Sequence, residues 1–242
     1  MKKLRKLLMA GAMATTLTAC GGGGGGAGGA VTNFVENDLT NLAGSETIIN
    51  SYSSLLTGFN STISTGNFAS LSAIMTGPNA EDIAKANTLL TMLDQAEDLW
   101  AQTLTLIESQ DADTKLSIYN SEDYKNAHAA LLYLKNHVKP VIQKVSQGKK
   151  LSLTEYNKVA SDKKAQELIK EEKDNTVETY VTQKKNTIEE TKKLAKETKK
   201  QEETKQEQSK EEESKEESKE ESKEEESKEE ESKEEESKEE EK

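Results

Sequence analysis

Apolar residues recur at steps of three and four through most of the central chain, the spacing that gathers side chains on one face of an α-helix. The pattern is clear over residues 46–64 and is longest over residues 79–109. No stretch alternates apolar and polar residues for long enough to predict a β-strand. The sequence therefore predicts an all-α protein: a small antiparallel bundle of three to five helices over residues 31–172, followed by a long helical or disordered charged tail.

The helix predicted over residues 46–64 has one continuous apolar face, which predicts burial against other helices. The face consists of Ile48, Ile49, Tyr52, Leu55, Leu56, Phe59 and Ile63. Weaker helical patterns lie before this helix, over residues 31–42, and after it, over residues 68–75.

The next helix should begin after Gly77 and Pro78, which stop the preceding segment. Asn79 is the expected N-cap, and Glu81 and Asp82 fall in the first turn, where acidic residues stabilise a helix. Steps of three and four then define a predicted seam of Ile83, Ala86, Leu90, Leu93, Glu97, Trp100, Leu104 and Ile107. The seam is about one helix long, which favours packing within a bundle over a long coiled coil.

A further helix is predicted from Ser121. Its apolar positions are Tyr124, Ala127, Leu131, Leu134, Val138, Val141 and Val145. Pro140 should kink or split this helix because proline removes a backbone donor and crowds the preceding turn. Gly148 is a natural helix stop.

A capping box formed by Ser152 and Glu155 predicts the start of the last bundle helix. Its apolar face, over residues 152–172, consists of Tyr156, Val159, Ala160, Ala165, Leu168 and Ile169. Apolar residues become sparse afterwards, so we expect packing to fade over residues 173–200, which form a helical extension.

Charge is distributed unevenly along the chain. The formal net charge is −12, and residues 201–242 hold 22 Glu and 9 Lys, a net charge of −13. This repeat of serine, lysine and glutamate predicts a solvated, low-complexity tail that attracts cations or basic proteins. The remaining chain is almost neutral. Neither part has the basic excess that binding nucleic acid requires, so we expect no nucleic-acid partner.

The N-terminal segment has the organisation of an export leader. A basic segment, residues 1–6, is followed by a short apolar run, residues 7–17, and then by Thr18, Ala19 and Cys20. The apolar run is shorter than the ~20 residues that a transmembrane helix needs. The tetrad Leu-Thr-Ala-Cys, an aliphatic residue and two small residues before a cysteine, resembles the lipobox of bacterial lipoproteins.

The resemblance implies a signal peptide over residues 1–19, cleaved between Ala19 and Cys20. Cys20 would carry a thioether-linked diacylglycerol, and the new amino group would be open to acylation. Residues 20–30, nearly all glycine after the cysteine, are expected to form a flexible tether. In a Gram-negative cell, glycine after the cysteine suits export to the outer membrane. The expected location is thus the cell envelope and not the cytoplasm, and the expected partner of Cys20 is membrane lipid.

Few residues suggest metal or catalytic chemistry. The two histidines, His128 and His137, point in opposite directions on one helix, so we interpret them as surface residues without a shared metal. Residues 111–122 match an EF-hand loop at three positions, but Lys115 and Leu116 stand where the loop needs a ligand and a glycine. We therefore predict no catalytic residue, no metal site and no cofactor.

Three acidic residues, Asp94, Glu97 and Asp98, share one helical face. Without a Glu-x-x-His motif they do not resemble a di-iron site of a helical bundle. Asp94 and Asp98 are expected to face solvent, whereas the seam would hold Glu97 inward. Trp100 is expected in the core, and the alternative is that it lines a ligand groove.

These observations favour a non-catalytic, membrane-anchored lipoprotein that acts as an interaction or spacer module of the cell envelope, with an envelope protein or cations at its acidic tail. One alternative is a cell-wall tether, because the acylated cysteine, helical body and terminal Lys242 are similar in layout to murein lipoprotein. The residues before Lys242 depart from that family, since its aromatic and basic side chains are missing. The other alternative is a helical bundle that binds a small apolar ligand between its helices.

Overall fold

The structure, a computed structural model, describes residues 27–64 and 75–205. Within these ranges the regular elements are helical and no strand occurs, which confirms the all-α prediction. In chain order the elements are α2 (Ala27–Asn37), η2 (Leu39–Asn41), α3 (Glu46–Ser64), α5 (Ala80–Glu108), α6 (Ala112–Asn120), α7 (Glu122–Tyr133), η3 (Leu134–Val138), α8 (Lys139–Ser146), α9 (Leu153–Ala160), α10 (Asp162–Glu172) and η4 (Lys173–Val177), followed by a helix over residues 178–205.

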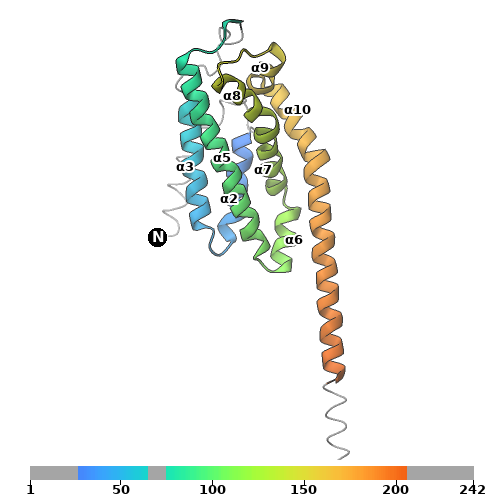
Figure 1. Cartoon of the computed structure of the whole chain (residues 1–242). Helices are drawn as coiled ribbons and strands as arrows, with labels where there is room; N and C mark the ends of the chain where they lie inside the picture. Colours follow the sequence, from blue (N-terminus) through green and yellow to red (C-terminus); the bar gives the residue numbers. More distant parts are fainter. Residues whose placement is uncertain (1–26, 65–74, 206–242) are drawn as a thin grey trace, which may run out of the picture. The chain divides into compact units, whose positions relative to one another are not determined.

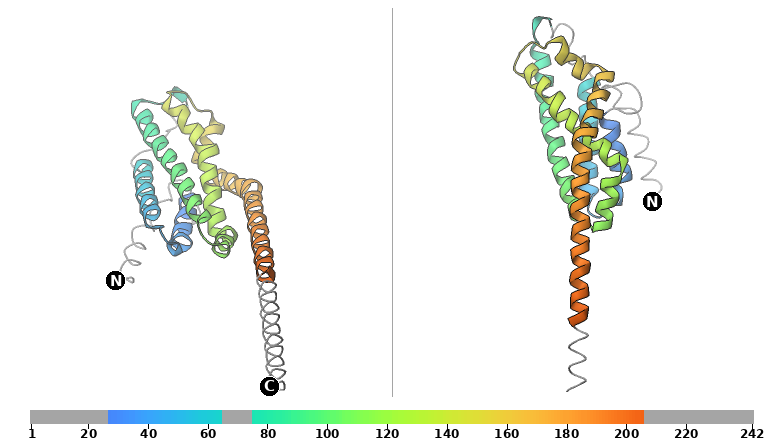
Figure 2. Two further views of the ribbon diagram at one scale, coloured as in Figure 1. Left: turned by 60° about the horizontal axis from the view of Figure 1, so that its bottom comes forward. Right: turned by 90° about the vertical axis from the view of Figure 1, so that its right-hand side faces the viewer.

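The bundle is antiparallel: α3, α5 and α7 run in alternating directions (Figure 1). α2 packs against α7, α3 against α5, α8 against α5, and α10 against α7. The π-helical segment η3 joins α7 to α8 without a break, and η4 likewise continues α10. Among the described residues, five helical segments therefore form the bundle, with the short helices α6 and α9 at opposite ends of it (Figures 1 and 2).

The core has two adjoining parts. One part is rich in aromatic residues and includes Phe34, Tyr52, Trp100, Tyr119 and Tyr124. The other part is mainly aliphatic and includes Ala86, Leu89, Leu93, Val138, Ile142, Val145 and Leu168. Burying a large apolar side chain contributes about 1.5–3 kcal/mol, so these two clusters hold the helices together.

The predicted starts of α3 and α5 are confirmed. Asn79 caps α5: its Oδ1 accepts from the backbone N–H of Asp82 at 2.8 Å, and the Asp82 carboxylate accepts from the Asn79 N–H at 3.2 Å. This reciprocal pair satisfies two donors that the first turn of a helix leaves unpaired. Over residues 46–58 of α3, the buried side chains are Ile48, Ile49, Tyr52 and Leu55. The side chains of Phe59 and Ile63, also predicted on this face, lie outside the described part.

The buried face of α5 is rotated from the predicted seam. One half of the seam is confirmed, at Ala86, Leu93, Trp100 and Ile107. The other half lies one residue earlier than predicted, at Leu89, Ala96 and Thr103. α5 contacts α3 as well as α8, and this packing between distant segments selects the face. The buried hydroxyl of Thr103 is satisfied because it donates to the carbonyl of Leu99 at 2.8 Å.

Of the two outcomes predicted for Pro140, a kinked or a split helix, the split does not occur. The chain passes through η3 and continues as α8, with Pro140 in the first turn of α8. A π-helical turn is wider than an α-helical turn, so the helix accommodates the missing N–H without ending. The helix ends at Ser146, and Gly148 follows with φ of 68°, a left-handed conformation that glycine adopts at little cost.

The helix predicted over residues 152–172 is two helices. Ser152 and Glu155 form the expected capping box, but α9 ends early and Ser161 begins α10 by accepting from the backbone N–H of Lys164. A serine hydroxyl can replace a helical hydrogen bond in this way, so the chain changes direction at an extended residue. The break allows α10 to pack on α7.

The N-terminal boundary of the bundle is also corrected. Residues 27–30, which were assigned to the tether, form the first turn of α2, and Ala27 and Gly28 are buried. Small residues allow close packing, which offsets the helix cost of about 1 kcal/mol for each glycine. Cys20 and the cleavage site at Ala19 lie outside the described residues.

Packing continues further along the chain than predicted. Val177, Val181 and Ile188 are buried, and the compact unit ends at Ile188. Residues 189–205 belong to a second unit and are helical, while residues 206–242 of the tail lie outside the described part. None of the helices in the described ranges is long and apolar enough to cross a bilayer.

Candidate ligand-binding cavity

A partly open cavity of about 260 Å³ lies between α5, the α7–η3 helix and the helix that includes η4. Its apolar walls come from α5 and α7–η3: Leu93, Ala96, Leu104, Leu131, Leu132 and Leu134. Its remaining walls carry aromatic and polar groups: Trp100, His128, Tyr180, Glu97, Lys135 and Thr176. A mainly apolar cavity with a few polar groups is the usual form of a small-molecule site.

Three rings form the aromatic wall. The His128 ring lies 5.0 Å from the Trp100 ring and 5.3 Å from the Tyr180 ring, measured between centroids. Tyr124 stacks on Trp100 with ring centroids 5.6 Å apart. Tyr124 and His128 are four residues apart on α7 and thus share one face of that helix. The wall is therefore assembled from α5, α7 and the helix that runs from α10 through η4 to Ile188, called the last bundle helix below.

His128 is buried, so its interpretation as a surface residue was wrong. The helix over residues 178–188 covers this side of α7, and the prediction that packing fades after residue 173 missed that cover. Burial lowers the pKa of His128 to about 4, although the negative charge of Glu172 acts in the opposite direction. The imidazole is therefore neutral at pH 7, with its Nδ1 3.5 Å from the Tyr124 hydroxyl oxygen.

Trp100 lies in the core, as expected, and is also at the surface of the cavity. Its Nε1–H is buried and has no hydrogen-bond partner among the described residues. Leaving a buried donor unpaired costs about 1–3 kcal/mol. The indole N–H is thus a donor whose hydrogen-bonding capacity remains unused within the described part of the chain.

Charged residues at the edge of the cavity pair with one another. Glu97 accepts from Lys139 at 2.6 Å and lies 3.3 Å from the Lys135 ammonium, and these contacts lower the pKa of its carboxyl group. Lys139 also pairs with Asp94 at 2.7 Å, whereas Asp98 is exposed and lines an open groove between α5 and α3. The three acidic residues thus do not converge.

Both π-helical segments contribute to this site. η3 supplies Leu134 and Lys135, and η4 supplies Thr176. Glu172 joins the two segments: its Oε1 accepts from Asn136 at 2.9 Å and lies 3.2 Å from His137 Nε2, and its Oε2 accepts from Thr176 at 3.1 Å. Pro140 accounts for η3, but residues 173–177 contain neither proline nor glycine. π-helical turns are frequent at functional sites, so their pairing here supports the cavity as a site.

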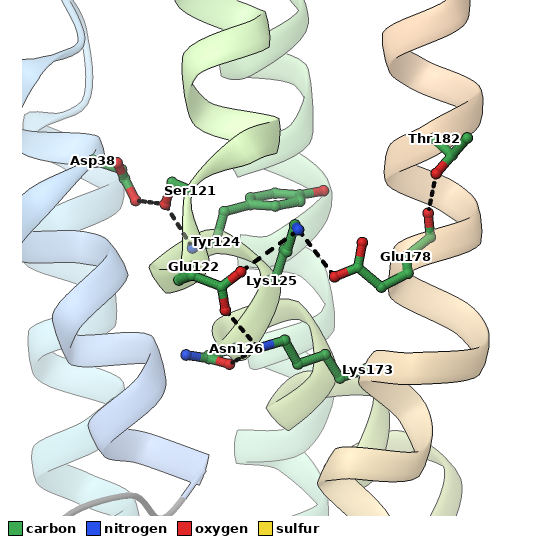
Figure 3. Close-up of polar contacts among 9 residues, drawn as sticks. All are labelled: Asp38, Ser121, Glu122, Tyr124, Lys125, Asn126, Lys173, Glu178 and Thr182. Carbon is green, nitrogen blue, oxygen red and sulfur yellow. Dashed lines mark hydrogen bonds and ion pairs between the residues drawn. The ribbon is translucent and has the colours of Figure 1, made fainter.

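A polar network holds the last bundle helix against α7 (Figure 3). Lys125 lies 2.9 Å from Glu178 and 3.6 Å from Glu122. Lys173 donates to Glu122 at 2.6 Å and to Asn126 at 2.9 Å. Because these contacts place the helix that contains Tyr180, they complete the aromatic wall.

The same region ties α2 to the start of α7. The Ser121 hydroxyl donates to Asp38 at 2.6 Å and accepts from the Tyr124 backbone N–H at 3.1 Å (Figure 3). Burial raises the pKa of Asp38, and the hydrogen bond from Ser121 partly offsets this effect. The Ser121 hydroxyl therefore both caps the start of α7 and holds α7 against the end of α2.

The remaining sequence candidates fold into ordinary structure. The segment that resembles an EF-hand loop is helix α6, and Asp111 is its N-cap, accepting from the backbone N–H groups of Asp113 and Thr114 at 2.9 Å each. Lys115 pairs with Glu108 rather than standing free. Over residues 27–64 and 75–205, no group of three metal-binding side chains converges.

The bundle thus presents a mainly apolar cavity with an aromatic wall, a neutral imidazole and a self-paired charged edge. These groups can enclose and orient a small molecule by burial and hydrogen bonding. The chain matches no protein-family model, and comparisons with curated proteins and with solved structures likewise yield no match.

Proposed function

We propose that this protein is a non-catalytic lipoprotein of the bacterial cell envelope, held at a membrane by acylated Cys20, whose helical bundle is a binding module. The observation that carries the proposal is the tetrad Leu17-Thr18-Ala19-Cys20 directly after a basic and apolar leader. Two or three acyl chains on one residue anchor a protein stably, whereas a single chain gives marginal binding.

The start of the bundle supports this arrangement. α2 begins at Ala27, seven residues after Cys20, and its first turn is packed into the core. Seven residues span at most about 25 Å when fully extended. An anchor at Cys20 would therefore keep the bundle within a short distance of the lipid surface.

Metabolic labelling with a radioactive fatty acid tests the anchor. The wild-type chain should incorporate label and sediment with membranes, whereas Cys20→Ser should remain unlabelled and retain its leader, which a gel shift would show. Thr18→Ser is the matched control, because it keeps a small residue at its position and should be labelled normally. Label in Cys20→Ser, or an unlabelled wild-type chain in the soluble fraction, contradicts the proposal.

The acidic tail supplies the second part of the module. Its 22 Glu and 9 Lys give a net charge of −13 over residues 201–242, which attracts cations and basic proteins. Binding of a basic probe protein such as cytochrome c should be lost when the chain is ended at Lys205, and should weaken steeply with salt because exposed charges are screened. If the full chain and the chain ended at Lys205 bind the probe equally at low salt, the tail is not the binding element and this part of the proposal fails.

A further inference from the structure

We propose that one end of the bundle docks on an anionic lipid surface. This end, called the basic end below, consists of residues 75–78, which precede α5, and residues 144–164, which run from the last turn of α8 through α9 to the start of α10. The inference deepens the proposed function, because it relies on acylated Cys20 to bring the bundle to a membrane. What it adds is which end of the bundle faces the lipid.

The two segments of the basic end lie side by side. Gly77 has a φ of 97°, and a Cβ atom placed on it would lie 3.7 Å from Cγ of Lys150. The start of α5 and the helix α9 are at the same end of the bundle, and α6 is at the other (Figure 1). The two segments therefore form one surface.

The two ends of the bundle carry opposite charge. Residues 144–164 contain six lysines and two acidic residues, and the adjoining residues 79–85 contain one lysine and two acidic residues. At the opposite end, residues 36–46 and 108–123 together contain eight acidic residues and one lysine. An anionic lipid surface attracts positive charge and repels negative charge. The charge distribution therefore turns the basic end towards the membrane.

Lysines of the basic end are available to lipid headgroups. Lys144 is paired with Glu155. Lys149, Lys150 and Lys163 are exposed and make no ion pair with another side chain in the described part of the chain. A lysine ammonium group on its flexible stem can reach a lipid phosphate. These three lysines can do so without giving up an ion pair within the protein.

Two large apolar side chains are exposed on the same end. Met75 is 74% exposed and Leu153 is 62% exposed, and among the described large apolar side chains Leu194 is the other one that is comparably exposed. Apolar side chains beside lysines insert among lipid headgroups, where they leave water. The acidic tail could pair with the lysines, but residues 201–242 contain no apolar side chain to cover Met75 and Leu153. A lipid surface therefore fits the basic end better than the tail does.

The tether from Cys20 is long enough for this orientation. Ala27 and Leu93 line one small cavity, so α2 begins about halfway along α5. Leu93 is thirteen residues from Ala80, the first residue of α5, which corresponds to about 20 Å of helix. The seven residues from Cys20 to Ala27 span at most about 25 Å. The tether reaches either end of the bundle, so charge decides between the ends.

Vesicle binding by a chain without acyl groups tests the surface separately from the anchor. The protein is residues 20–242 with Cys20→Ser, which keeps the whole bundle and the tail and removes the basic, apolar leader, because such a segment binds lipid by itself. The vesicles consist of phosphatidylcholine alone, which is neutral overall, or of an equal mixture with anionic phosphatidylglycerol. Sedimentation in about 0.1 M salt, where the Debye length is about 10 Å, measures the bound fraction.

The chain should bind the anionic vesicles and not the neutral ones. Lys149→Gln combined with Lys150→Gln should weaken this binding at least tenfold, because each lysine at an anionic surface strengthens binding about fivefold. Leu153→Ser should weaken it severalfold, because the apolar contact with the lipid is lost.

The matched control removes two positive charges at the opposite end, by Lys115→Gln combined with Lys185→Gln. Lys115 lies in α6, and Lys185 follows Lys184, whose ammonium group contacts Glu108 at the end of α5. These positions are several Debye lengths from the basic end, so the change should alter binding by less than about twofold.

A fluorescent probe reports which end contacts the lipid. The chain has one cysteine, so Cys20→Ser leaves Leu153→Cys as a single site for a polarity-sensitive dye. Anionic vesicles should shift the emission of this dye to the blue. The same dye on Glu46→Cys, an exposed position at the opposite end, should show no shift.

Four results would overturn the inference: no binding to anionic vesicles, equal binding to neutral vesicles, an equal loss in the control variant, or a blue shift at position 46 without one at position 153. A change in the emission of the dye at position 153 when the chain is ended at Lys205, before lipid is added, would also overturn it, because the tail would then cover the basic end. A chain that binds vesicles as expected but never incorporates fatty acid would uphold the docking surface and reject the anchor at Cys20.

Discussion

The imidazole of His128 lies against the indole of Trp100, with ring centroids 5.0 Å apart, and both side chains are buried. Tyr124 from the same helix and Tyr180 from the last bundle helix also contact the histidine, and the negative charge of Glu172 acts on it. A titratable group in such surroundings makes the stability of the fold depend on pH.

The first prediction concerns this pH dependence. The pKa of His128 is about 4 in the folded protein and 6.5 in the unfolded chain. The unfolded chain therefore binds the proton first as pH falls, so stability is lost from pH 6.5 down to pH 4. The free energy of unfolding should fall by about 2 kcal/mol between about pH 7.5 and pH 5 through His128.

His128→Phe should remove this dependence, because phenylalanine does not titrate and keeps an aromatic ring in place. Urea unfolding of both proteins at the two pH values measures it. Asp38, Glu172 and the other carboxyl groups are common to both proteins, so the difference between the two slopes isolates His128. Equal slopes would show that His128 is not buried in neutral form.

The second prediction concerns the buried hydroxyl pair of Tyr52 and Thr103. Thr103 Oγ1 donates to the Leu99 carbonyl at 2.8 Å and lies 3.4 Å from the Tyr52 hydroxyl. Thr103→Val should destabilise by about 1–3 kcal/mol, because the Tyr52 hydroxyl then stays buried without this partner. Tyr52→Phe should cost about 0.5–1 kcal/mol, because Thr103 keeps its bond to Leu99.

Urea unfolding of the two single variants and the double variant tests this asymmetry. The double variant should be less destabilised than the sum of the single variants, since neither hydroxyl then remains unpaired. A larger loss of stability for Tyr52→Phe than for Thr103→Val would contradict this asymmetry. It would mean that Thr103 depends on Tyr52 for its hydrogen bond more than Tyr52 depends on Thr103.

The third prediction concerns the ion pair between Lys125 and Glu178, whose charged atoms are 2.9 Å apart. A double-mutant cycle with Lys125→Met and Glu178→Gln should give a coupling energy of about 0.5–1 kcal/mol at low salt, because Lys125 is largely buried but Glu178 is partly exposed. The coupling should fall in about 1 M salt, where exposed charges are screened.

The matched control is the exposed pair Lys164 and Glu167, which are three residues apart on α10. Their charged atoms lie 3.2 Å apart. The same substitutions there should give a coupling energy of about 0.3 kcal/mol or less. Equal coupling at the two pairs would mean that the contact shown in Figure 3 does not help to hold the last bundle helix on α7.

The fourth prediction concerns the cap of α5. Asn79→Ala should destabilise the bundle by about 1 kcal/mol, because the first turn loses its side-chain acceptor. Thr91→Ala, an exposed change in the middle of the same helix, should stay within about 0.5 kcal/mol of the wild type. Thermal or urea unfolding compares them, and equal stability of the two variants would contradict the role of the cap.

Much of the fold is predictable from the sequence because its signals are local. The bounds of α3, the Asn79 cap and the capping box at Ser152 depend on side chains within a few residues of one another. The acidic tail and the lipobox resemblance are likewise patterns in neighbouring residues. The candidate cavity was predictable only in part: Trp100 was recognised as a possible groove residue, but His128 was placed on the surface.

The sequence by itself determined the helical class, most helix starts and the distribution of charge, because helix periodicity and capping act over one or two turns. Tertiary structure decided which face of α5 is buried, that the last bundle helix covers His128, and that η3 and η4 meet at Glu172. These features depend on contacts between residues dozens of positions apart. A helical period shows that a side chain lies on a given face, but the neighbouring helix decides whether that face is covered.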